Sequence, residues 1–145
     1  MKVSFISRFR NVFLGMILGG VAFSQEGPVY VEQFQNLQKS VDQIFDEISN
    51  GVPGKGDQLL LGERLFALKK VTHRLQEGAG EADNAARQRG AGVNKRLRLV
   101  VQGCMAIDSV LQALGNYLDT DDRFFLILAI EGKQTTSSIR KVLVK

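Results

Sequence analysis

The stretch KRLRLVVQGCMAIDSVLQALGNYL, residues 95–118, decides the fold. Wound as a helix, it carries two stripes of apolar or small residues, each at alternating steps of three and four residues. One stripe is bulky and consists of Leu97, Val100, Cys104, Ile107, Leu111, Leu114 and Leu118. The other runs down nearly the opposite side, is mostly small, and consists of Leu99, Gly103, Ala106, Val110, Ala113 and Tyr117. A helix with two such stripes has neighbours on two sides, so we expect residues 95–118 to form the central helix of a bundle.

The same spacing of apolar residues recurs in two segments upstream. In residues 28–50 it is carried by Tyr30, Phe34, Leu37, Val41, Ile44 and Ile48. In residues 57–78 it is carried by Leu61, Leu65, Leu68, Thr72 and Leu75. We predict one helix that starts at Pro28 and stops before Gly51, and a second that Asp57 caps and Gly78 ends. Three segments with this repeat predict an all-α antiparallel bundle of about four helices.

Two other segments have weaker patterns. Residues 78–94 are rich in Gly and Ala, so we predict a flexible connection with a short helix at 81–89, after which Asn94 caps the central helix. Residues 119–122 are acidic and are expected to cap a short helix at 124–130, which Gly132 ends. A last helix, capped within residues 135–138, would complete the chain. The alternative is a terminal hairpin, in which residues 124–130 pair with residues 139–144.

The first 24 residues have the layout of a secretory signal peptide. A basic segment with Lys2, Arg8 and Arg10 precedes an apolar run over residues 12–23, and the ending Ala22-Phe23-Ser24 is small-x-small. We predict cleavage before Gln25, which leaves residues 25–145 as a single exported helical domain, periplasmic or secreted, without a membrane-spanning segment. The apolar run would span about 18 Å as a helix against a hydrocarbon core of about 30 Å. A retained membrane anchor is therefore the weaker alternative.

Charge singles out one candidate binding surface. The net charge is +4, but three of the 19 basic residues lie in the leader, which leaves 16 against 15 acidic residues. No acidic residue occurs between Asn84 and Ile107, and that stretch contains Arg87, Arg89, Lys95, Arg96 and Arg98. We interpret these as five uncompensated cations that contact an anionic partner, such as lipid headgroups, an acidic polymer or an acidic protein. A solvated helix end is the alternative, and nucleic acid is disfavoured because no aromatic residues are interleaved for base stacking.

The residues that most often carry catalysis point to no active site. His73 is the only histidine and lies among basic residues, so we expect it to be solvated; Cys104 is the only cysteine, and we expect a buried, inert thiol. Asp42, Asp46 and Glu47 fall on the outer face of their helix. We therefore predict no catalytic, cofactor or metal site and no enzymatic activity.

Together these patterns predict a non-enzymatic, exported helical interaction module. Its partner would be a protein or an anionic surface in the cell envelope or outside the cell. The alternative is a self-associating structural protein, in which the apolar stripes are buried between chains of a homo-oligomer, as in a coiled coil.

Overall fold

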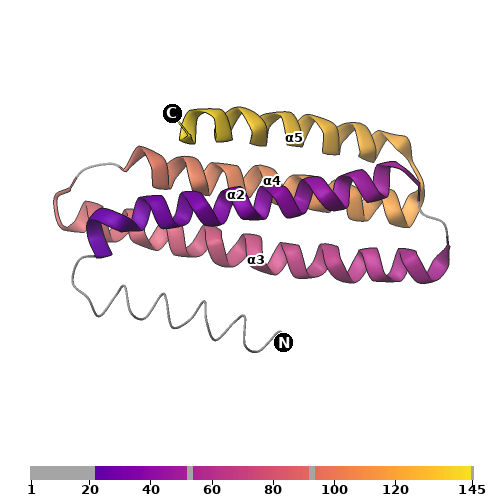
Figure 1. Ribbon diagram of the computed structural model, residues 1–145, viewed down its shortest axis with the longest axis horizontal. Coiled ribbons are helices and arrows are strands. Elements are labelled where there is room, and N and C mark those ends of the chain that lie inside the picture. The colour runs from indigo at the N-terminus through magenta and orange to yellow at the C-terminus, as the bar shows by residue number, and fades with distance from the viewer. Residues whose placement is uncertain (1–21, 52–53, 92–93, 145) are drawn as a thin grey trace.

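The computed structural model describes residues 22–51, 54–91 and 94–144. They form four helices: α2 (Ala22–Ser49), α3 (Lys55–Gln88), α4 (Lys95–Thr120) and α5 (Arg123–Leu143). Successive helices run in opposite directions, so that α2 and α4 point one way and α3 and α5 the other (Figure 1). The predicted all-α fold is thus confirmed for the described residues. The signal peptide was predicted over residues 1–24, of which residues 1–21 lie outside them.

The helix on which the fold was predicted lies at the centre of the bundle. α4 packs against α3 and α2 and also carries α5, which lies on the side away from α3 (Figure 1). All seven residues of the bulky stripe are buried. The small stripe meets α2 at Gly103, which lies against the Phe34 ring, and meets α5 at Val110, which lies against Gly132. Among the described helices, α4 alone is long and apolar enough to cross a membrane. Buried core helices of soluble proteins commonly have the same length and composition, and half of the most apolar 18 residues of α4 are buried.

The first described helix extends further than predicted at its beginning. α2 starts at Ala22, so the prediction that Pro28 opens it is wrong. Pro28 lies inside the helix and has no N–H to donate to the carbonyl one turn earlier. Cleavage before Gln25 would place Pro28 in the first turn, where backbone N–H groups lack helical partners in any case. The predicted end is confirmed, because α2 stops at Ser49 and Gly51 has a left-handed φ of 105°.

The second described helix differs from the prediction at both ends. α3 begins at Lys55 with Gly54 at its N-cap, so Asp57 lies in the first turn and is not the cap. Gly78 does not end the helix either. α3 continues to Gln88, so the predicted flexible connection over 78–94 and the separate helix at 81–89 are wrong. Ala79 and Ala82 are buried, and a Cβ on Gly78 would lie 3.2 Å from the Tyr30 ring, so these small residues let α3 and α2 approach closely. That packing outweighs a cost of about 1 kcal/mol for a helical glycine.

The chain ends in one long helix. α5 runs unbroken from Arg123 to Leu143, so the stop at Gly132, the second cap at 135–138 and the alternative hairpin are all wrong. Gly132 is a packing position, because a Cβ there would lie 2.5 Å from Val110 Cγ2. The hydroxyls of Thr135, Thr136 and Ser138 each donate to the carbonyl four residues earlier, within the helix. Two predicted N-caps are confirmed. The Asp122 side chain accepts a hydrogen bond from Phe124 N at 2.9 Å, and the Asn94 side chain accepts one from Leu97 N at 3.2 Å.

Candidate anion-binding surface

The five cations predicted from the sequence lie together at one end of the bundle. Arg87 is in the last turn of α3, Arg89 follows that helix, and the other three are among the first four residues of α4. α3 and α4 run in opposite directions and are joined only by residues 89–94, so both sets of cations meet at the left end of Figure 1. All five side chains are exposed there.

Arg87 and Arg98 are compensated, which corrects the prediction that all five cations are uncompensated. Asp83 is buried, and its Oδ2 lies 3.0 Å from Arg87 Nη2 and 3.7 Å from Arg98 Nε. Asn94 N also donates to Asp83 Oδ1, at 3.4 Å. Asp83 thus ties the end of α3 to the start of α4. The sequence analysis missed this carboxylate because the stretch without acidic residues was counted from Asn84, one residue after Asp83, although Asp83 lies one helical turn before Arg87.

The remaining charge is concentrated at the start of α4. Lys95 and Arg96 are exposed and form no ion pair with any side chain in the described ranges. They stand at the positive end of the helix dipole, where a cation costs a few tenths to about 1 kcal/mol. The first backbone N–H groups of a helix lack intrahelical partners, which is why helix N-termini favour bound anions, and in α4 the Leu97 N–H is already taken by the Asn94 cap. An anion held here would therefore relieve the repulsion between these side chains and the helix end.

α5 adds a cation that sequence reasoning did not assign to this surface. Gly132 of α5 lies against Val110 and the Ala106 carbonyl of α4, which fixes the register of these antiparallel helices. Each step along α5 goes one step back along α4, so Arg140 lies level with about Val100, close to the start of α4. Arg140 is exposed. We call the set Arg87, Arg89, Lys95, Arg96, Arg98 and Arg140 the basic end.

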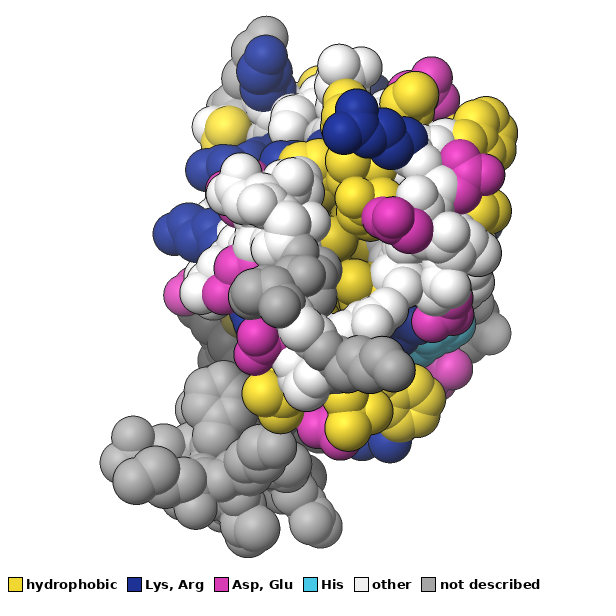
Figure 2. Space-filling view, turned by 90° about the vertical axis from the view of Figure 1, so that its right-hand side faces the viewer, with side chains coloured by type: hydrophobic (Ala, Val, Ile, Leu, Met, Phe, Trp, Pro, Cys, Tyr) yellow, Lys and Arg dark blue, Asp and Glu magenta, His cyan; other side chains and the backbone are white. Residues whose placement is uncertain are grey.

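Among the described residues, the opposite end of the bundle carries charges of both signs. There the α2–α3 and α4–α5 connections lie side by side, and Figure 2 shows acidic, basic and hydrophobic side chains interspersed. Asp119, Asp121 and Asp122 belong to this end, and Asp122 is engaged as the cap of α5. The cluster of exposed cations at the start of α4 is therefore not repeated among the described residues of this end.

The sites considered for catalysis resemble ordinary surface or core positions. The His73 side chain is 61% exposed, and its Nε2 lies 3.4 Å from Asp108 Oδ1. Cys104 is fully buried, and burial raises the pKa of its thiol from 9.0 to about 12, so the reactive thiolate is suppressed. In the described part of the chain, no three His, Cys, Asp or Glu side chains are grouped closely enough to hold a metal ion.

The carboxylates of α2 join neighbouring helices. Asp46 and Glu47 are exposed and Asp42 is half-buried, as expected for an outer face. Glu47 pairs with Arg64 of α3, and Asp42 Oδ1 lies 3.6 Å from Lys133 Nζ of α5. Asp42 and Glu47 are thus used in ion pairs between helices. Compared with protein-family models, curated proteins and solved structures, the chain matches none.

Proposed function

We propose that this protein is an exported, non-enzymatic interaction module whose basic end binds an anionic surface in the cell envelope or outside the cell. The observation that carries the proposal is the exposure of Lys95 and Arg96, without an ion pair in the described structure, at the positive end of α4. Arg140 adds a third exposed cation from α5. A concentration of cations at one end raises the local concentration of polyanions and orients the molecule on them.

Phosphate-bearing lipid headgroups are the anionic surface that we favour. The basic end lacks the interleaved aromatic residues used to stack nucleic-acid bases. Each cation near an anionic bilayer contributes about 1 kcal/mol to binding, so a few exposed cations suffice for measurable affinity. An acidic polymer would use the same charges and is distinguished by the experiment below.

The test is sedimentation of the full chain with vesicles of phosphatidylglycerol and phosphatidylcholine, against vesicles of phosphatidylcholine alone. The variant Lys95→Gln/Arg96→Gln/Arg140→Gln should lose about a hundredfold in apparent affinity, from roughly 1 kcal/mol per cation. The matched control, Lys39→Gln/Arg74→Gln/Arg123→Gln, removes the same charge from exposed positions elsewhere. It should change binding by much less.

If the two triple variants lose the same vesicle affinity, the binding depends on net charge alone and the proposal of a localised surface is refuted. Binding that persists on phosphatidylcholine vesicles would refute the electrostatic mechanism. Binding to a soluble acidic polymer but not to the anionic vesicles would reassign the surface from lipid to polymer.

Self-association is the second candidate, but the structure changes where it would occur. The bulky stripe of α4 is buried inside one chain, so the apolar stripes are not free to pair between chains. Exposed apolar side chains do occur on the first turns of α5, where Phe124 and Ile127 are 57% and 54% exposed. Analytical ultracentrifugation over a range of concentrations tests this candidate, and a monomer at every concentration removes it.

A further inference from the structure

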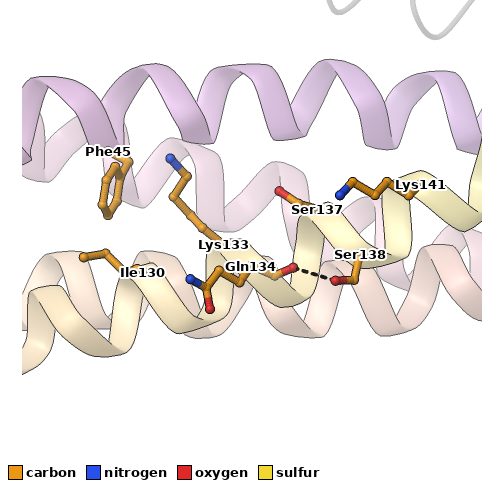
Figure 3. Close-up of a pocket in the computed structure, with 7 residues that line it drawn as sticks. All are labelled: Phe45, Ile130, Lys133, Gln134, Ser137, Ser138 and Lys141. Atoms are coloured by element: carbon orange, nitrogen blue, oxygen red, sulfur yellow. Dashed lines mark hydrogen bonds between the residues drawn. The ribbon is translucent and has the colours of Figure 1, made fainter.

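An open hollow lies between α2 and α5 (Figure 3). It exists because α5 packs mainly on α4, through Ala129, Gly132 and Thr136, and touches α2 much less. The hollow has a volume of about 410 Å³. Its lining residues are Phe45 from α2 and Ile130, Lys133, Gln134, Ser137, Ser138 and Lys141 from α5.

One end of the hollow is apolar. Phe45 and Ile130 form it, and Ile130 remains 42% exposed although it lines a cavity. Lys133 Nζ lies 4.1 Å from the centre of the Phe45 ring and 3.6 Å from Asp42 Oδ1. The charge of Lys133 is therefore already satisfied by a ring face and a carboxylate. What this end offers is mainly hydrocarbon surface.

The other end has two hydrogen-bond donors without partners. Ser137 is half-buried, and unlike the hydroxyls of its neighbours Thr136 and Ser138 its hydroxyl makes no hydrogen bond within the described structure. Lys141 is exposed and forms no ion pair with the described residues. Figure 3 shows both side chains on the side of α5 that faces α2, with the Lys141 side chain reaching along α5 toward Ser137. An ammonium group beside a hydroxyl matches the oxygens of a phosphate or carboxylate.

The spacing of the two ends suits an elongated ligand. Lys133, Ser137 and Lys141 follow one another at steps of four residues, so they lie on one side of α5 about 6 Å apart along its axis. From Ile130 to Lys141 the hollow therefore runs about 16 Å. That length accommodates a headgroup at Lys141 and several methylene groups that reach toward Phe45.

We propose that this hollow binds a single-chain anionic amphiphile, with its phosphate or carboxylate headgroup on Lys141 and Ser137 and its alkyl chain on Ile130 and Phe45. The site is separate from the basic end, which supplies long-range attraction to an anionic surface. It refines the proposed function by naming a headgroup site. The two can fail independently, because Lys141 is not part of the basic end and the triple variant above leaves the hollow intact.

The probe is octyl phosphate below its micelle-forming concentration, titrated into the full chain by calorimetry and by backbone amide NMR. Inorganic phosphate has the headgroup alone, and octyl glucoside has the same chain without the charge. Octyl phosphate should bind at least tenfold more tightly than either. Along a series of alkyl phosphates, affinity should rise about two- to fourfold per methylene until the apolar end is filled, the upper value being that of a fully buried methylene.

The variants locate the site. Lys141→Gln should weaken octyl phosphate binding about five- to tenfold, since a charge-assisted contact is lost, and Ser137→Ala should weaken it less. Arg123→Gln removes the same charge from the other end of α5 and should leave binding unchanged. Ile130→Ala should reduce the gain in affinity per methylene group and leave the affinity for the phosphate headgroup unchanged. Circular dichroism checks that each variant folds, which is expected because Lys141 and Arg123 are exposed.

The proposal is overturned if Lys141→Gln binds octyl phosphate as wild type does, or if octyl glucoside binds equally well. It is also overturned if the NMR shifts fall outside the lining of the hollow, which consists of residues 130–141 of α5 and the turn of α2 around Phe45. A vesicle arm separates the sources of the ligand. Loss of lipid binding in Lys141→Gln supports a membrane lipid, whereas loss of octyl phosphate binding alone supports a soluble amphiphile.

Discussion

Replacing Gly103 by alanine tests the closest helix contact in the bundle. Gly103 is buried in the middle of α4, and a Cβ built there would lie well under 3.0 Å from two carbons of the Phe34 ring. Carbon atoms in contact normally lie about 3.5–4.0 Å apart, so the ring or α2 would have to move by about 1 Å. Phe34 has no exposed surface, so the ring has no solvent to move into.

The expected magnitude follows from two opposing effects. Alanine in place of glycine favours a helix interior by about 1 kcal/mol. Overpacking a core costs about 1–3 kcal/mol, and the upper part of that range applies because two atoms of a buried ring are struck. We therefore expect Gly103→Ala to lower the free energy of unfolding by about 1–2 kcal/mol.

Gly115 is a matched control in the same helix. A Cβ at Gly115 meets nothing within 4 Å, so Gly115→Ala should gain about 0.5–1 kcal/mol. Urea unfolding followed by circular dichroism measures both, and the two variants should differ by about 1.5–3 kcal/mol with an unchanged m value. Phe34→Leu should relieve the overlap, so the double variant should be more stable than the sum of the single effects predicts. A Gly103→Ala protein at least as stable as Gly115→Ala would refute the close packing of α2 on α4.

Three further predictions concern buried polar groups. Gln38 is 2% exposed and its Oε1 has no hydrogen-bond partner, so Gln38→Met should raise the free energy of unfolding by about 1 kcal/mol, measured by urea unfolding. Asp83→Asn should lower the free energy of unfolding by about 1 kcal/mol, a small value because the side chains of Arg87 and Arg98 are 40% and 48% exposed to solvent. Amide hydrogen exchange around residue 94 should become faster in this variant. Cys104 should resist thiol reagents at pH 8 until urea unfolds the chain. Burial raises the pKa of Cys104 from 9.0 to about 12, so between these pH values the folded state keeps a proton that the unfolded state loses. The free energy of unfolding should therefore fall as the pH rises from 9 to 12. Cys104→Ala should make this pH dependence weaker.

The parts of the fold that the sequence predicts are those fixed by periodicity. The spacing of Leu97, Ile107 and Leu114 on α4, and of Phe34 and Ile44 on α2, identified side chains that are buried in the structure. Local capping chemistry was also sufficient at Asn94 and Asp122, because their side chains bond to backbone N–H groups two or three residues away. Such features depend on neighbours in sequence and need no knowledge of the tertiary fold.

The two errors that ended helices too early share one physical cause, which is that glycine has two uses. Gly78 and Gly132 were each interpreted as the end of a helix, since glycine favours the backbone conformation beyond a C-terminus. Both lie inside helices, where the missing side chain makes room for Tyr30 and Val110. The two uses cannot be separated without knowing which helix lies opposite. Gly51, with its left-handed φ, is the position where the first use is correct.

Parts of the candidate sites were also missed. The stretch without acidic residues was counted from Asn84, one residue after Asp83, so Arg87 and Arg98 were counted as uncompensated. Breaking α5 at Gly132 prevented Arg140 from being placed beside α4, and it separated Ile130 from Lys141, which now line one hollow. Lys133, Ser137 and Lys141 at steps of four were visible in the sequence, but they indicate a site only once α5 is continuous and faces Phe45.

The placement of α5 connects the packing of the fold with its candidate sites. The two stripes of α4 let one helix bury itself on several neighbours, and the small stripe admits α5 through Gly132, close to Val110. A helix held mainly by one neighbour leaves part of its length uncovered, and on the α2 side that uncovered part is the hollow. Gly132→Ala should therefore disturb the docking of α5 and with it both the hollow and the position of Arg140, while Lys95 and Arg96 stay in place. Octyl phosphate binding should fall in this variant more than vesicle binding does, and the reverse order would contradict the division of roles between α5 and the start of α4.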